Sequence, residues 1–143
     1  MSAPELVQSG FTYRITNAKS GTVMDLSGLD NKTVIGYPNF NTNNQQWALQ
    51  WTNIGWTFRS VSSGLYLGID GPLADGTRLV AKPEPFGWHI WHDEVDSSTY
   101  RIFVPNTTLN VDLNNHGSTV PGTAITLWYR WLGIHQTWRF ERV

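Results

Sequence analysis

The stretch Asn44-Gln45-Gln46-Trp47 ends in a Gln-x-Trp triplet, and the chain uses the same triplet again as Gln136-Thr137-Trp138. Between the two, an altered form of the triplet reads Phe86-Gly87-Trp88. A tryptophan that returns at the same place in a repeated pattern is typical of a buried side chain that holds each repeat to a shared core. The triplets therefore predict three copies of one unit, of which the second has diverged.

The beginnings of the copies repeat as well. Each copy starts with an aromatic residue followed by arginine, and these starts are 45 and then 42 residues apart. The three starts are Tyr13-Arg14-Ile15, Phe58-Arg59-Ser60 and Tyr100-Arg101-Ile102. We place the copies at about residues 10–51, 52–96 and 97–143, within a single domain that spans residues 1–143.

The local patterns inside each copy predict strands. Gly, Asn, Asp and Pro divide the chain into short runs, and almost no run keeps a helical spacing beyond one turn. Segments such as Thr137-Trp138-Arg139-Phe140 alternate as half-buried strands do. Copies of about 40 to 47 residues with roughly four strands each are too small to close a core alone. We therefore predict an all-β fold in which the three copies form one closed, barrel-like body with pseudo-threefold symmetry.

The triplets also carry a family resemblance. They resemble those of the ricin B-chain type of β-trefoil lectin, and Gly36-Tyr37-Pro38 followed by Asn44-Gln45-Gln46-Trp47 resembles the small cysteine-free lectins of mushrooms. The resemblance covers essentially residues 10 to 143. It implies a β-trefoil, but this fold also carries protease inhibitors and cytokines, so the candidate site residues have to decide the function.

Composition excludes several classes of function. Only 15% of the residues are charged and the net charge is -1, so we expect no basic surface for nucleic acid or anionic lipid. The absence of cysteine removes disulfides, thiol catalysis and thiolate metal sites, and it fits a reducing compartment. Met1-Ser2-Ala3-Pro4-Glu5 lacks a signal-peptide pattern, and no apolar run approaches the ~18 residues of a membrane span. A cytoplasmic protein without membrane insertion is expected.

In the first copy, the resemblance implies a sugar pocket built from four residues: Asp25, Tyr37, Asn44 and Gln45. A carboxylate and an amide exchange hydrogen bonds with vicinal hydroxyls, while an aromatic ring covers the apolar face of a pyranose. Gly28 is expected to let the backbone approach the ligand. Three residues of the polar loop are expected at the rim: Asn39, Phe40 and Asn43.

The other two copies depart from this pattern. In the third copy, the matching positions are Asp112, Trp128, His135 and Gln136, and the histidine replaces an asparagine. Imidazole still donates or accepts one hydrogen bond, so the third copy could hold either an active or an inactive secondary sugar pocket. In the second copy, Gly68, Lys82 and Phe86 provide neither the carboxylate nor the ring, and Asp70 lies two residues further on. We interpret the second copy as structural.

Structural interpretations compete at each candidate position. Asp25 and Asp112 could accept hydrogen bonds within their own turns, which is a common role of aspartate. Tyr37 and Trp128 could belong to the core, although the neighbouring Pro38 and Tyr129-Arg130 indicate strand ends near solvent.

Apparent catalytic motifs do not support an enzyme. His89-Ile90-Trp91-His92 would place its two histidines on opposite faces of a strand, which does not suit a metal site. A glycosidase would require two carboxylates across one cleft. The carboxylates that recur here, Asp25 and Asp112, lie in different copies. We predict no catalytic residue, metal or cofactor.

The resemblance implies a lectin that binds glycans of glycoproteins and glycolipids reversibly, without metal. Galactose and N-acetylgalactosamine at glycan ends are the implied ligands, and defence is the implied purpose. A protease inhibitor that binds through Pro83-Glu84-Pro85-Phe86 or Pro105-Asn106-Thr107 is the alternative, and a purely structural domain is a third. A homodimer is also considered, because four further large rings exceed what one core absorbs: Trp51, Trp56, Trp91 and Trp131.

Overall fold

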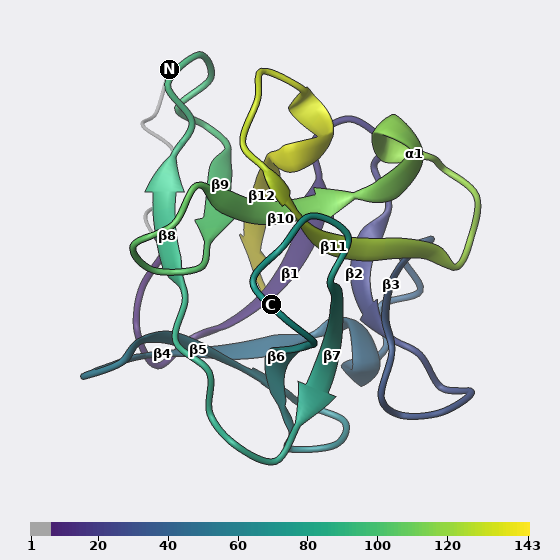
Figure 1. The fold of residues 1–143 in the computed structure, drawn as a ribbon. Helices are drawn as coiled ribbons and strands as arrows, with labels where there is room; N and C mark the ends of the chain where they lie inside the picture. The colour runs from purple at the N-terminus through teal and green to yellow at the C-terminus, as the bar shows by residue number, and fades with distance from the viewer. Residues whose placement is uncertain (1–6) are drawn as a thin grey trace.

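The computed structural model describes residues 7–143 and confirms the all-β fold (Figure 1). Residues 1–5, on which the absence of a signal peptide was predicted, lie outside the described part. The strands of the structure are β1 (Thr12–Asn17), β2 (Val23–Leu26), β3 (Val34–Tyr37), β4 (Trp47–Thr52), β5 (Gly55–Ser60), β6 (Tyr66–Asp70), β7 (Arg78–Lys82), β8 (His89–His92), β9 (Tyr100–Phe103), β10 (Leu109–Leu113), β11 (Thr123–Tyr129) and β12 (Trp138–Arg142). Its helical turns are η1 (Asn43–Gln45), α1 (Asn114–Gly117) and η2 (Ile134–Gln136). Within residues 7–143, no helix is long and apolar enough to cross a membrane.

Six strands close into a barrel. β1 pairs with β4 and β12, β4 with β5, β8 with β9, and β9 with β12. The remaining gap between β5 and β8 is joined by an antiparallel bridge from Trp56 to Trp88. Because the ring is closed, the backbone N–H and C=O groups of these six strands pair with one another, and the barrel leaves no long open edge.

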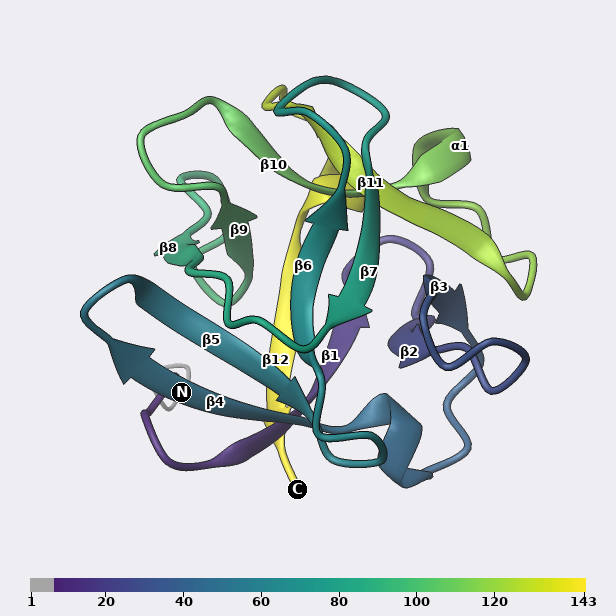
Figure 2. The same cartoon turned by 60° about the horizontal axis from the view of Figure 1, so that its bottom comes forward.

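The other six strands form three hairpins, one from each copy. They are β2–β3, β6–β7 and β10–β11. The hairpins contact one another where β11 pairs with β3 and β7, and where Thr33 bridges to Val80 (Figure 2). Barrel and hairpins together give the predicted pseudo-threefold arrangement.

The three repeated tryptophans connect the barrel to the hairpins. Trp47, Trp88 and Trp138 are completely buried, as the triplets predicted. Each indole Nε1–H donates to a backbone carbonyl in its own hairpin: Met24 at 3.1 Å, Leu67 at 3.0 Å and Val111 at 3.1 Å, respectively. A buried indole needs such a partner, so the same hydrogen bond appears in every copy.

The aromatic residues that begin the copies meet at the centre. Tyr13, Phe58 and Tyr100 are buried, and all three rings pack against Phe140 of β12, with centroid distances of 6.0, 6.2 and 5.3 Å. One central ring therefore contacts the first barrel strand of every copy. This shared contact is the physical reason why the copies form one core.

Candidate functional site

The strand register places a carboxylate and a ring on the same side of two hairpins. Val23, two residues before Asp25, pairs with Tyr37 across β2–β3. Asn110, two residues before Asp112, pairs with Trp128 across β10–β11. Residues two apart on a strand share a face, so in both hairpins the ring is the diagonal neighbour of the carboxylate. We call these two places the first site and the third site.

Gln45 holds Asp25 in the first site. The amide nitrogen Nε2 of Gln45 donates to Oδ2 of Asp25 at 2.9 Å and to the carbonyl of Pro38 at 2.8 Å. The amide oxygen of Gln45 accepts from the backbone N–H of Phe40 at 2.9 Å. Both amide hydrogens are used and the side chain is buried, so the amide nitrogen of Gln45 serves to orient the Asp25 carboxylate.

Asn44 and the aromatic rings complete the first site. The side chain of Asn44 donates to the carbonyl of Leu26 at 3.2 Å and forms a hydrogen bond that stabilises the charged form of Asp25. Tyr37 is 36% exposed, and its ring lies 6.0 Å from the more exposed ring of Phe40. Two partly exposed rings beside a carboxylate provide an apolar wall and an acceptor.

The remaining predicted residues of the first copy lie in the surrounding loop. An added Cβ on Gly28 would meet nothing within 4 Å, so the fold itself does not require glycine there. Oδ1 of Asn39 accepts a hydrogen bond from the backbone N–H of Asn41 at 3.0 Å, within the same loop. Asn43 is exposed at the start of η1.

Burial sets the charge state of Asp25. Removal from water raises the pKa of its carboxyl above the ordinary value of 3.8, and the hydrogen bonds from Gln45 and Asn44 act against this rise. Asp25 accepts hydrogen bonds from the side-chain amides of Gln45 and Asn44. Its contacts therefore extend beyond its own turn, unlike those of an aspartate that only caps a turn.

The third site repeats the same frame. Nε2 of Gln136 donates to Oδ2 of Asp112 at 2.9 Å and to the carbonyl of Tyr129 at 3.0 Å. His135, in the place of Asn44, puts its Nε2 3.2 Å from the same Oδ2. Burial raises the pKa of Asp112 and lowers that of His135, while their mutual attraction opposes both shifts. A neutral imidazole that donates to a carboxylate fits this geometry.

The third site also contains residues that the sequence did not reveal. A hollow of about 290 Å³ is lined by Asp112, Trp128 and His135, and His116 and Trp131 close its other side. The His116 ring lies 5.9 Å from Trp131 and 5.6 Å from His135. Positive φ angles at Asn115 and His116 bring this segment over the hollow, and the Asn-Asn-His-Gly run is the signal that could have indicated it.

In the second copy, the side chains of Lys82 and Phe86 lie close to Gly68, the position that corresponds to Asp25. A Cβ added to Gly68 would lie 3.4 Å from Cδ of Lys82 and 3.8 Å from Cβ of Phe86. The Phe86 ring packs 4.9 Å from Trp88. Gly87 is required here, because its Cβ would lie only 1.8 Å from the carbonyl oxygen of Ile54. Close packing of the backbone at Gly87 therefore accounts for the glycine in the diverged second triplet.

The other sequence motifs take structural places. The His92 ring contacts the carbonyl of Ser97 through Nδ1, and His89 packs edge-on against Trp91. Residues 7–143 contain no group of three or more His, Cys, Asp or Glu side chains that could hold a metal. Of the four rings on which the homodimer hypothesis rests, Trp51, Trp91 and Trp131 are substantially exposed. The fourth, Trp56, is partly buried and packs against the core.

Comparisons with known proteins agree with this architecture. A family model described as "Ricin-type beta-trefoil lectin domain-like" matches residues 43–128. The ricin B-like lectin of Macrolepiota procera, solved in complex with lactose, is 57% identical, with a TM-score of 0.96 over 97% of this chain and 100% of that one. The Rhizoctonia solani agglutinin is 24% identical, with a TM-score of 0.87 over 99% and 100%. The designed threefold-symmetric protein ThreeFoil is 22% identical, with a TM-score of 0.82 over 92% and 99%. The comparison with curated proteins found no match.

Proposed function

Because the chain belongs to the family of ricin-type β-trefoil lectins, we propose that its first site binds glycans ending in galactose or N-acetylgalactosamine. The observation that carries this proposal is the Asp25 carboxylate, held by Gln45 beside the exposed ring of Tyr37. The lactose bound by the Macrolepiota procera lectin supports it, because lactose ends in galactose.

The geometry suggests how the sugar is held. Asp25 accepts hydrogen bonds from the hydroxyls on C3 and C4 of the terminal galactose. Asn44 bridges a neighbouring hydroxyl, and Tyr37 stacks against the apolar face of the ring. Gln45 contributes indirectly, because both of its amide hydrogens already hold Asp25 and Pro38. Binding by these contacts requires no metal and changes no covalent bond.

The protease-inhibitor alternative gains no support. Phe86, at the end of the Pro83-Glu84-Pro85-Phe86 loop, packs against Trp88 and is only partly exposed, so it is not free to enter a protease. A panel of galactosides measured by calorimetry and on a glycan array tests the lectin proposal directly. Absence of binding to every galactoside and N-acetylgalactosaminide would overturn it.

The Tyr37 ring should decide the strength of binding. Tyr37→Ala is expected to weaken lactose binding by about 0.5 to 1.5 kcal/mol beyond the lost contact area, whereas Tyr37→Trp should retain or improve it. Calorimetric titration with lactose measures both variants. Trp91→Ala is the matched control, because it removes an exposed ring from β8, outside the first site. Equal losses in the Tyr37→Ala and Trp91→Ala variants would exclude stacking on Tyr37.

Lactose binding should also depend on pH. Since the ionised carboxylate is the better acceptor and burial raises the pKa of Asp25, acidification should weaken binding at a higher pH than an ordinary aspartate would. Below that pKa, the affinity should fall by about tenfold per pH unit. Calorimetric titrations from neutral pH to about pH 4 would show the decline.

The stability contribution of Asp25 runs in the opposite direction. A raised pKa in the folded state means that this group stabilises the fold at low pH and that the contribution is lost as pH rises through the folded pKa. Thermal unfolding over the same pH range therefore separates lost binding from lost folding. A pH-independent lactose affinity would contradict a direct role for the Asp25 carboxylate.

A further inference from the structure

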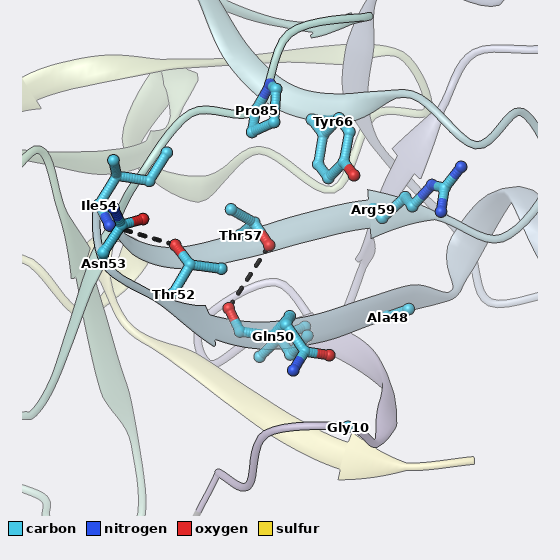
Figure 3. A pocket seen from close by; sticks show the side chains of 11 residues that line it. Gly10, Ala48, Gln50, Thr52, Asn53, Ile54, Thr57, Arg59, Tyr66 and Pro85 are labelled. Carbon is cyan, nitrogen blue, oxygen red and sulfur yellow. Dashed lines mark hydrogen bonds between the residues drawn. The ribbon is translucent and has the colours of Figure 1, made fainter.

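A further hollow of the described structure lies away from the first and third sites. It has a volume of about 420 Å³ and is bounded by the β4–β5 hairpin, Tyr66 and Pro85 (Figure 3). This volume falls in the range of roughly 300 to 1,000 Å³ that small-molecule sites occupy. We call it the β4–β5 hollow. No residue that lines it belongs to the first or third site.

Arg59 gives this hollow its charge. The arginine that follows the first aromatic residue recurs in each copy, but its partners differ. Arg14 forms an ion pair with Glu141 at 2.9 Å, and Arg101 forms a buried ion pair with Asp93 at 2.8 Å. Within residues 7–143, Arg59 forms no ion pair, and no acidic side chain lines the β4–β5 hollow. Its positive charge is therefore available to a ligand.

The guanidinium of Arg59 is also oriented in advance. Its Nε donates to the carbonyl of Gly64 at 2.8 Å, and its Cζ lies 5.6 Å from the centre of the Tyr66 ring. These two contacts hold one edge and one face of the group, and they leave the terminal nitrogens for a ligand. Two parallel N–H donors on one guanidinium match the two oxygens of a carboxylate.

The rest of the lining suits a sugar ring. Tyr66, Pro85 and Ile54 provide apolar surface around the hollow, as Figure 3 shows. Gln50 and Asn53 bring side-chain amides to the same space. Amides bind hydroxyl groups, and apolar surfaces cover the C–H face of a pyranose.

We propose that the β4–β5 hollow binds a carboxylate-bearing sugar, with Arg59 paired to the carboxylate and Tyr66 and Pro85 against the sugar ring. A hexuronic acid and a sialic acid share this chemistry. The site would be separate from the galactose site and would let one chain contact two sugars of different charge.

Matched ligands test the charge requirement. Methyl β-glucuronide and methyl β-glucoside have the same ring and differ in the carboxylate, and the methyl α-glycoside of N-acetylneuraminic acid represents sialic acids. Calorimetry, with NMR to locate the shifts, should show that one or both acids bind and perturb Gly64 and Tyr66. The neutral glucoside should bind about 10- to 100-fold more weakly than the glucuronide, or not at all. Binding by neither acid, or equal binding of glucuronide and glucoside, would overturn the proposal.

Matched variants separate this site from the first one. Arg59→Gln should reduce acid-sugar affinity by about 10- to 100-fold and leave lactose binding unchanged. Arg78→Gln removes another exposed arginine, on β7 and outside the hollow, and should change neither affinity. Asp25→Ala should leave acid-sugar binding intact. The assignment to the β4–β5 hollow would be refuted if Arg59→Gln retained acid-sugar binding or if Asp25→Ala lost it. This result does not depend on whether lactose binds at the first site.

Discussion

Asp25→Ala is expected to remove most of the lactose binding while leaving the fold intact. A hydrogen bond to a charged group contributes about 1.5 to 3 kcal/mol, so the affinity should fall by about 10- to 100-fold or more. The fold should tolerate the change for two reasons. Burial disfavours the charged form of Asp25, as its raised pKa indicates, so the fold does not depend on this charge. Gln45 also keeps its hydrogen bond to Pro38. Calorimetry gives the affinity, and circular dichroism with thermal unfolding checks the fold.

The other copies provide the controls. Asp70→Ala removes an exposed acid at the end of β6 in the second copy and should leave lactose binding unchanged, as should Lys82→Ala. Asp112→Ala should reduce binding partly or not at all. An unchanged affinity in Asp25→Ala would place the galactose site elsewhere, and a complete loss in Asp112→Ala would make the third site the principal one.

Arg101→Met should cause a large loss of stability, about 3 to 5 kcal/mol of unfolding free energy. Arg101 is 3% exposed, and besides Asp93 its guanidinium donates to Asn110 at 3.0 Å and to the amide oxygen of Gln136 at 2.9 Å. Removal of the arginine leaves the Asp93 carboxylate buried without its charged partner. Chemical denaturation of the two proteins at the same pH measures the difference.

Arg14→Met is the matched control, because Arg14 holds the same position in the first copy. Its ion pair with Glu141 is partly exposed, so the loss should be about 0 to 1 kcal/mol. The double variant Asp93→Asn with Arg101→Met should recover part of the stability. Losses of equal size at Arg14 and Arg101 would contradict the special role of burial.

The Arg101 effect should depend on pH in a defined direction. Burial alone would raise the pKa of Asp93, but hydrogen bonds from Arg101 and from the backbone N–H groups of Asp96 and Val95 lower it below 3.8. A lowered pKa in the folded state contributes stability above the unfolded value, and this contribution is lost as pH falls through the folded pKa. The difference between Arg101→Met and the parent protein should therefore be largest near neutral pH and shrink in acid.

Much of the fold could be predicted from the sequence, because repetition is visible in one dimension. The Gln-x-Trp triplets and the aromatic-arginine starts mark equivalent points of three units, and units too small to fold alone must share a core. The family resemblance indicated Asp25 with Tyr37 and Asp112 with Trp128, and each hairpin repeats the strand register that makes the ring a diagonal neighbour of the carboxylate. The burial of Trp47, Trp88 and Trp138 followed from their position in the repeat.

The roles of equivalent residues were decided only by the tertiary structure. Sequence alone could not show that Gln45 supports Asp25, or that His116 and Trp131 close the third site, because these contacts join different elements. The three repeated arginines make the same point. Arg14, Arg59 and Arg101 occupy one position of the repeat, yet one is paired at the surface, one faces an open hollow and one is buried with Asp93. A repeat determines where a side chain begins, but its charge, burial and partners depend on residues brought beside it from distant parts of the chain.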